Sequence, residues 1–263
     1  MRLEKARDAY KTKDLEATKE AHSKKVIQAA KEEHTRERGK YLGDFVYGAL
    51  DGMVTTFAVV SGVEGAKLSS SVVLILGFAN LFGDGISMAL GNYLSTKSEL
   101  DYIKKERERE SWEVDNVPDG EREEIRQIFK KKGFEGKDLD RAVEVITSDK
   151  KRWVDTMMHE ELGLNVEDKN PLKSALTTFG AFAIAGFLPL LAFVVAIIFP
   201  NIFSNTFFIS AIITGVAMFS VGAMRSWVTG MKWYRSGIEM LFVGSIAASA
   251  AYLVGFLLKG LGV

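Results

Sequence analysis

The chain has 263 residues, and its 34 Lys and Arg residues balance 34 Asp and Glu residues, so the formal net charge is zero. It contains no cysteine, which excludes disulfide bonds, thiolate metal sites and thiol catalysis. These totals would suit an ordinary soluble protein, but the distribution of charge and apolar residues along the chain indicates an integral membrane protein, for which we expect no nucleic-acid partner.

The first 40 residues are charged and lack the apolar stretch of a signal peptide, so we expect no signal peptide here. We predict a charged, Ala-containing helix over residues 1–40, in the cytosol or on the membrane surface. His22 and His34 lie in this segment without a tight helical spacing between them. We interpret both as surface residues.

Two apolar spans follow over residues 41–96, and both carry acid. The first, YLGDFVYGALDGMVTTFAVVSGV, contains Asp44 and Asp51, and the second contains Asp84. A carboxylate at membrane depth costs about 2.5–3.5 kcal/mol, so such residues tend to face an interior path and to mark function.

The spacing of these residues places them on shared helix faces. Asp44 and Asp51 are two helical turns apart, which separates them by about 10.5 Å along one face. Asn80, Asp84 and Met88 share one face of the second span. We predict that the two faces meet and that Asp44, Asp51, Asp84 and Met88 form a cation path.

Asp44 has a second interpretation, because it lies near the predicted cytosolic interface. There it can simply pair with a basic residue such as Lys40. Asp51 lies deeper in the span, where a role in the path is favoured over pairing.

An acidic segment separates the second span from the third. Residues 97–170 contain 16 Lys and Arg against 21 Asp and Glu, for a net charge of −5. Because no Pro or Gly interrupts the chain between Gly91 and Pro118, we predict that the second span continues into the cytosol as one helix. Helices over 119–132 and 137–147 follow, and a third starts after Asp149 as N-cap and stops at Gly163. The sequence therefore predicts a small cytosolic helical domain.

This insert carries residues suited to metal binding. Carboxylates recur at helical spacing, and a Met-Met pair that looks exposed lies one turn before a glutamate. Thioether sulfur suits iron-like or softer metals, whereas Mg²⁺ and Ca²⁺ prefer oxygen alone. The alternative that these glutamates are solvated surface residues without a metal stays open, because Lys and Arg alternate with them as they do on solvated helices. His159 adds little as a lone histidine. The candidate ligands are Glu106, Glu110, Glu113, Glu121, Glu124, Met157, Met158 and Glu161.

Residues 171–263 provide the remaining spans. No charged residue occurs from Ser174 to Met224, which is long enough for two crossings separated by the turn at 200–205. A last span covers about 238–258, giving five in total. The fold class is therefore all-α, a polytopic membrane protein in a lipid bilayer with the helical metal-binding insert between spans two and three.

Basic residues predict the orientation. We expect the N-terminus and the insert in the cytosol and the C-terminus outside, and we place the protein in a prokaryotic cell membrane, or in the vacuolar membrane if it is eukaryotic. The predicted inner side receives residues 1–40, residues 97–170 and the 227–236 turn with Lys232 and Arg235; the outer side receives only Lys67, the uncharged 200–205 turn and Lys259.

Three motifs occur in one order along the chain: DGMVTTFAVVSG at 51–62, GISMALGNYLSTKSE at 85–99 and TMMHEE at 156–161. With these motifs the chain resembles the vacuolar iron transporter family from about residue 40 to the C-terminus. The resemblance implies a homodimer that exports cytosolic Fe²⁺, and also Mn²⁺, in exchange for protons, with the ion path at the subunit interface. It implies neither enzymatic activity nor a prosthetic group.

The resemblance also assigns roles to residues by motif. Asp51 and Met88 correspond to the membrane ligands, and Asp44 to an aspartate earlier in the path. In the insert, which in the family binds several metal ions and delivers them to the path, the corresponding ligands are Glu110, Glu113, Glu121, Glu124, Met157, Met158 and Glu161.

The chain departs from the family pattern in two places. Asn80 stands near a position where some members carry glutamate, and Asn92 stands in GNY where they have GEY. This puts the proton route in doubt, although Asp84 lies one turn from Asn80. Two alternatives to an exporter are a membrane-bound metal sensor or storage protein and a di-iron membrane oxidase; the second lacks the Glu-x-x-His pairs that it needs.

Overall fold

The structure is a computed structural model that describes residues 6–23 except 7 and 11, 40–165, 169–199, 202–229 and 231–260. The chain forms two compact units, Met1–Lys40 and Tyr41–Val263. Throughout the described ranges the regular elements are helices and no strand occurs, so the prediction of an all-α protein is confirmed.

In the first unit, helix α2 covers Leu15–Ala21. Asp14 caps its start, because the Asp14 carboxylate accepts a hydrogen bond of 3.0 Å from the Ala17 backbone N–H. Much of the helix predicted over residues 1–40, including His34, lies outside the described residues.

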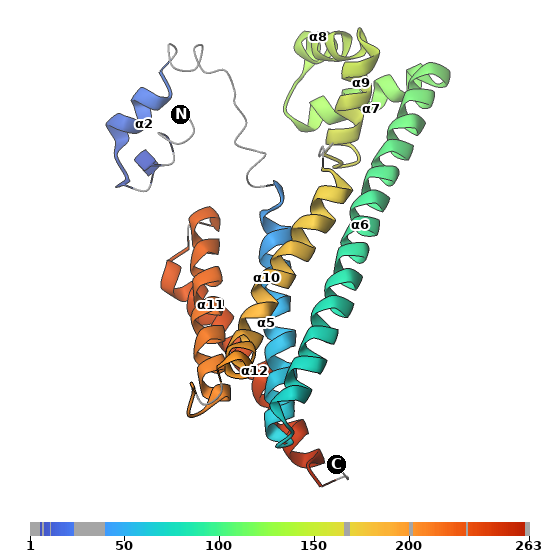
Figure 1. The fold of residues 1–263 in the computed structure, drawn as a ribbon. Helices are drawn as coiled ribbons and strands as arrows, with labels where there is room; N and C mark the ends of the chain where they lie inside the picture. Colours follow the sequence, from blue (N-terminus) through green and yellow to red (C-terminus); the bar gives the residue numbers. More distant parts are fainter. Residues whose placement is uncertain are drawn as a thin grey trace. The chain divides into compact units, whose positions relative to one another are not determined.

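Among the described residues, five helices of the second unit are long and apolar enough to cross a membrane (Figure 1). They are α5 (Leu42–Gly65), α6 (Ser70–Asn116), α10 (Pro171–Ile198), α11 (Thr206–Thr229) and α12 (Trp233–Leu258). The number of spans agrees with the prediction. The turn between the last two is shorter than predicted, because Arg235 and Ser236 lie inside the first turn of α12. A basic side chain at a helix end can reach the interface, so its charge does not require a loop.

Helix α5 lies at the centre of the bundle and contacts the other four long helices. Its glycines permit a close approach to α10. A Cβ atom at Gly48 would lie 2.4 Å from the carbonyl oxygen of Thr178, and one at Gly52 would lie 2.4 Å from that of Phe182. Small residues therefore set the distance between these helices, as is typical of membrane helix pairs.

Helix α6 is continuous over 47 residues, so one helix carries both the second apolar span and the start of the insert. At about 1.5 Å per residue it is about 70 Å long. This continuity follows from the sequence, since no helix breaker occurs before Pro118, which is the first residue of α7 (Pro118–Lys131).

The insert is completed by α7, α8 (Gly136–Thr147) and α9 (Lys150–Glu160). Helices α7 and α9 pack against α6, and α8 packs against α7 and α9 (Figure 1). Gly133 follows α7 with φ +91°, a conformation that side chains with a Cβ rarely adopt. Asp149 caps α9, as predicted, by accepting a hydrogen bond from the Arg152 N–H. The buried core of this domain consists of Ile103, Val114, Ile125, Leu139, Val143, Trp153, Val154, Met157 and Met158.

Candidate metal sites

Three carboxylates converge where α6 ends and α7 begins. Because α7 turns back at Pro118, Glu121 in its first turn meets Glu110 and Glu113 of α6. One carboxylate oxygen from each of the three lies within 4.8 Å of the others. Among the described residues, this is the group of acidic and histidine side chains whose geometry could hold a metal ion.

Two of these carboxylates are buried with an oxygen left unpaired. Glu110 is 1% exposed and Glu121 is 6% exposed, and the Oε2 atom of each lacks a hydrogen-bond partner. A buried, unpaired carboxylate oxygen is costly, so the carboxyl group takes up a proton or a cation. The arrangement thus favours a bound cation.

The electrostatics of the cluster point the same way. Burial raises the pKa of Glu110 to about 7, against the opposing effect of Arg109 and with added repulsion from Glu161 and Glu113. Burial likewise raises the pKa of Glu121 to about 7, with added repulsion from Glu124 and Glu110. Near neutral pH these two groups exchange protons readily, and a cation that binds them displaces those protons.

Two further carboxylates, those of Glu161 and Glu124, add to the negative charge around the cluster. Burial raises the pKa of Glu161, and repulsion from Glu124 of α7 raises it further. Glu161 itself caps the end of α9, where its N–H donates to the Met157 carbonyl. Helices α6, α7 and α9 therefore all contribute acid to one region of the insert.

Arg109 provides a cation within this acidic region. Its Nη2 lies 2.6 Å from Glu110 Oε1, its Nη1 lies 2.5 Å from Glu113 Oε2, and its Nε lies 3.0 Å from Glu106 Oε2. Glu106 is thus linked to the cluster through Arg109, and it is not one of the three converging carboxylates. The sequence analysis overlooked Arg109, although its spacing of three from Glu106 and four from Glu113 is the usual one for helical ion pairs.

The Met-Met pair is not exposed, and that expectation is wrong. Met157 is 0% exposed and Met158 is 1% exposed, within the hydrophobic core of the insert. Helix α9 is amphipathic and directs both sulfurs inward together with Trp153 and Val154. Their role as metal ligands stays a prediction.

At the start of α5, Asp44 is held by several partners. Asp44 Oδ2 accepts a hydrogen bond of 2.7 Å from Ser174 Oγ, and Oδ1 accepts one of 3.2 Å from Asn92 Nδ2. Lys169 Nζ lies 3.4 Å from Oδ2. Asp44 therefore pairs with a basic residue, as its second interpretation predicts, and this residue is Lys169. Local spacing carries no signal for these partners, which come from distant parts of the chain.

Deeper in the bundle, polar groups of α5 and α6 meet. Asn80 Nδ2 donates to Thr55 Oγ1 at 3.3 Å, and Thr55 Oγ1 donates to the Asp51 carbonyl at 2.8 Å. Asp51 is half-buried and lies close enough to Asp84 to interact electrostatically. Met88, also half-buried, packs against a hydrophobic cluster of the bundle.

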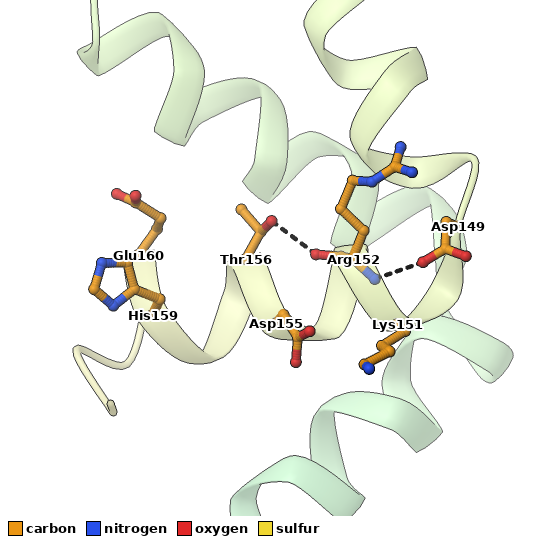
Figure 2. A pocket seen from close by; sticks show the side chains of 7 residues that line it. All are labelled: Asp149, Lys151, Arg152, Asp155, Thr156, His159 and Glu160. Carbon is orange, nitrogen blue, oxygen red and sulfur yellow. Dashed lines mark hydrogen bonds between the residues drawn. The ribbon is translucent and has the colours of Figure 1, made fainter. Parts of the chain in front are cut away.

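A shallow hollow on α9 is a weaker candidate (Figure 2). It contains Asp155 and His159, one helical turn apart, which is a spacing that can chelate a metal. Asp155 is already paired with Arg107, and Glu160 is paired with Lys132, whose hydrogen bond lowers the pKa of Glu160. The carboxylates of Asp155 and Glu160 therefore have counter-ions, unlike the unpaired oxygens of Glu110 and Glu121.

The chain matches the family model described as the VIT family over residues 42–256. It is 38% identical to the vacuolar iron transporter of Toxoplasma gondii, over 98% of this chain and 88% of that protein. It is 36% identical to the vacuolar iron transporter of Plasmodium falciparum, over 83% and 82% of the two chains. It is 37% identical to vacuolar iron transporter 1 of Arabidopsis thaliana, over 81% and 84%.

These relatives are named as transporters and not as enzymes. The match extends across all five long helices and the insert between them. The chain belongs to the VIT family, a family of membrane transporters.

Proposed function

We propose that this protein exports divalent transition-metal ions, Fe²⁺ and also Mn²⁺, from the cytosol in exchange for protons. The observation that carries the proposal is the pair of buried, unpaired carboxylate oxygens of Glu110 and Glu121 beside Glu113. The names of the relatives support iron as the substrate.

Capture of the metal is the proposed task of the insert, residues 97–170. Carboxylate oxygens suit divalent ions, and a ligand set that adds sulfur favours iron-like metals over Mg²⁺ and Ca²⁺. Because the carboxyl groups near neutrality hold protons, metal binding releases them into the cytosol. We propose as ligands Glu106, Glu110, Glu113, Glu121, Glu124, Met157, Met158 and Glu161.

Passage through the membrane is assigned to residues 41–96 and 171–263, with Asp51 and Met88 as ligands and Asp44 and Asp84 along the path. A carboxylate in a poorly hydrated site holds either a proton or a metal, because a bare charge there is costly. Metal and proton then compete for one site, and this competition couples their movement in opposite directions. The hydrogen bond between Asn80 and Thr55 ties α6 to α5 next to Asp51.

A homodimer is part of the proposal. Asp84 is exposed on α6, and a Cβ atom added at Gly83 or at Gly91 would meet open space. Because a carboxylate facing hydrocarbon is costly, this face is better covered by a second copy than by lipid. Orientation follows the basic residues, with residues 1–40 and the insert in the cytosol and the C-terminus outside. The membrane would be vacuolar in a eukaryote and the cell membrane in a prokaryote.

The test is metal uptake into proteoliposomes that contain a pH-sensitive dye, with and without an imposed proton gradient. We expect Fe²⁺ influx with proton efflux. Asp51→Asn should abolish transport. The matched control is Glu64→Gln, which should retain transport, because Glu64 lies in the last turn of α5 and pairs with Lys67. Metal binding without flux in the wild type would instead identify a sensor or storage protein.

A further inference from the structure

One positively charged side chain reaches three of the carboxylates to which the proposed function assigns metal binding. Arg109 of α6 contacts Glu106, Glu110 and Glu113 through three different nitrogens, at 3.0, 2.6 and 2.5 Å. A planar guanidinium is suited to several carboxylates at once. Nothing in the metal-capture scheme uses this residue.

The Arg109 side chain is exposed enough to move away from the carboxylate cluster. Its side chain is 43% exposed, whereas Glu110 beneath it is 1% exposed. Arg109 binds Oε1 of Glu110, and the other oxygen, Oε2, is buried without a partner, as is Oε2 of Glu121. The guanidinium therefore binds the cluster from a partly exposed position, whereas the unpaired oxygens are buried.

A metal ion at this cluster would compete with Arg109. Both are cations that need the same carboxylates of Glu110 and Glu113, and like charges at short range in a partly buried site repel strongly. Glu106 lies outside the group of converging oxygens and can keep its bond to Arg109 after the other two are lost. The side chain thus has a partner to retain when a metal arrives.

We propose that Arg109 is an internal counter-ion that occupies the empty capture site and is displaced by the metal. In the metal-free protein it offsets the repulsion among the carboxylates and keeps them in place. On metal binding it moves toward Glu106 and solvent, and its nearby charge lowers the metal affinity so that the ion can be passed on. The inference rests on the proposed metal capture by the insert.

The experiment measures Mn²⁺ affinity of the full-length protein in detergent at pH 7, by following free Mn²⁺ with electron paramagnetic resonance. Removing one positive charge next to a cation site should tighten binding, so we expect R109Q to bind about tenfold more tightly than the wild type. The matched control is R141Q in the same domain, because Arg141 of α8 pairs with Glu144 outside the cluster. Its affinity should not change.

Thermal unfolding separates the counter-ion role from a structural one. R109Q should lower the melting temperature of the metal-free protein. Adding Mn²⁺ should restore the melting temperature of the variant, since the metal replaces the missing charge. Unchanged or weaker Mn²⁺ binding in a folded R109Q would overturn the proposal. If R109Q does not fold, R109K provides the test. The lysine ammonium replaces the three-nitrogen fork of arginine with a point contact and is displaced more easily, so R109K should bind Mn²⁺ more tightly than the wild type. Equal or weaker binding would refute the proposal.

Failure of the underlying function gives a different result. If wild-type Mn²⁺ binding is absent, or does not respond to E110Q, the insert does not capture metal, and both proposals fall. If wild-type binding responds to E110Q while R109Q leaves the affinity unchanged, only the role of Arg109 is wrong.

Discussion

Lowering the pH from 7 to 6 should weaken metal binding by the insert about 30-fold. The reason is that Glu110 and Glu121 are buried with unpaired oxygens, and burial raises the pKa of each to about 7. A carboxyl with this pKa is about half ionised at pH 7 and about one-eleventh ionised at pH 6. Each group that must release a proton therefore weakens binding about 5.5-fold, and two together about 30-fold.

Carboxyl groups with ordinary pKa values near 4.3 would give a different result. They are almost fully ionised at both pH values, so the affinity would hardly change. The ratio of the two affinities thus reports directly on the burial of the cluster. It does not depend on the absolute affinity.

The assay is a Mn²⁺ titration of full-length protein in the Asp51→Asn background, so that the measured binding comes from the insert. Glu121→Gln should reduce the pH 7 to pH 6 ratio to about fivefold, because one of the two proton-releasing groups is gone. His159→Gln is the matched control, because His159 of α9 lies outside the three converging carboxylates, and it should leave the ratio unchanged. A wild-type ratio near one would refute the reasoning.

Three other predictions follow from the structure. Gly52→Ala should destabilise the bundle by about 1–3 kcal/mol, because its Cβ would lie 2.4 Å from a backbone carbonyl oxygen of α10. Gly180→Ala is the control and should not destabilise the bundle, because open space surrounds that position. Thermal unfolding in detergent compares the two variants. Lys169→Met should lower the free energy of unfolding by about 1–3 kcal/mol, because it leaves the Asp44 carboxylate without its cation. Combining it with Asp44→Asn should recover much of that loss. Additive losses in the two single variants and the double variant would contradict the pairing. Burial raises the pKa of Glu110 and Glu121 to about 7, so the metal-free folded state binds more protons than the unfolded state. Their contribution to stability is therefore full below about pH 4.5 and is lost as pH rises through about 7, at a cost of up to about 3 kcal/mol for each group. Unfolding curves of metal-free protein at pH 5 and 7.5 should show this loss, and Mn²⁺ should reverse it; a metal-free protein that is equally stable at both values would argue against it.

Much of the fold could be predicted from local sequence because local physics determines it. An apolar stretch of about 20 residues has to form a helix in hydrocarbon to satisfy its backbone hydrogen bonds. The single long α6 follows from the absence of Pro and Gly between Gly91 and Pro118, and the start of α9 follows from the Asp149 cap. The predicted 227–236 turn is too long, because α11 continues to Thr229 and Arg235 lies in the first turn of α12.

Side-chain surroundings were less predictable. Met157 and Met158 looked exposed next to charged neighbours, but α9 packs them into the core of the insert, and a helix face is chosen by what it packs against. The sequence predicts that Asp44 can pair with a basic residue, but not that this residue is Lys169, nor that Ser174 and Asn92 also bind the carboxylate. No spacing rule reaches across 125 residues.

Local sequence is enough to predict the main helices, the five spans and the acidic residue types at each candidate site, since these depend on hydropathy, helix breakers and spacing within one helix. Tertiary packing brings Glu121 of α7 to Glu110 and Glu113 of α6 and buries two of these carboxylates with unpaired oxygens. Local sequence cannot predict this, because burial and charge repulsion depend on which helix faces meet, and the packing of the whole domain selects those faces.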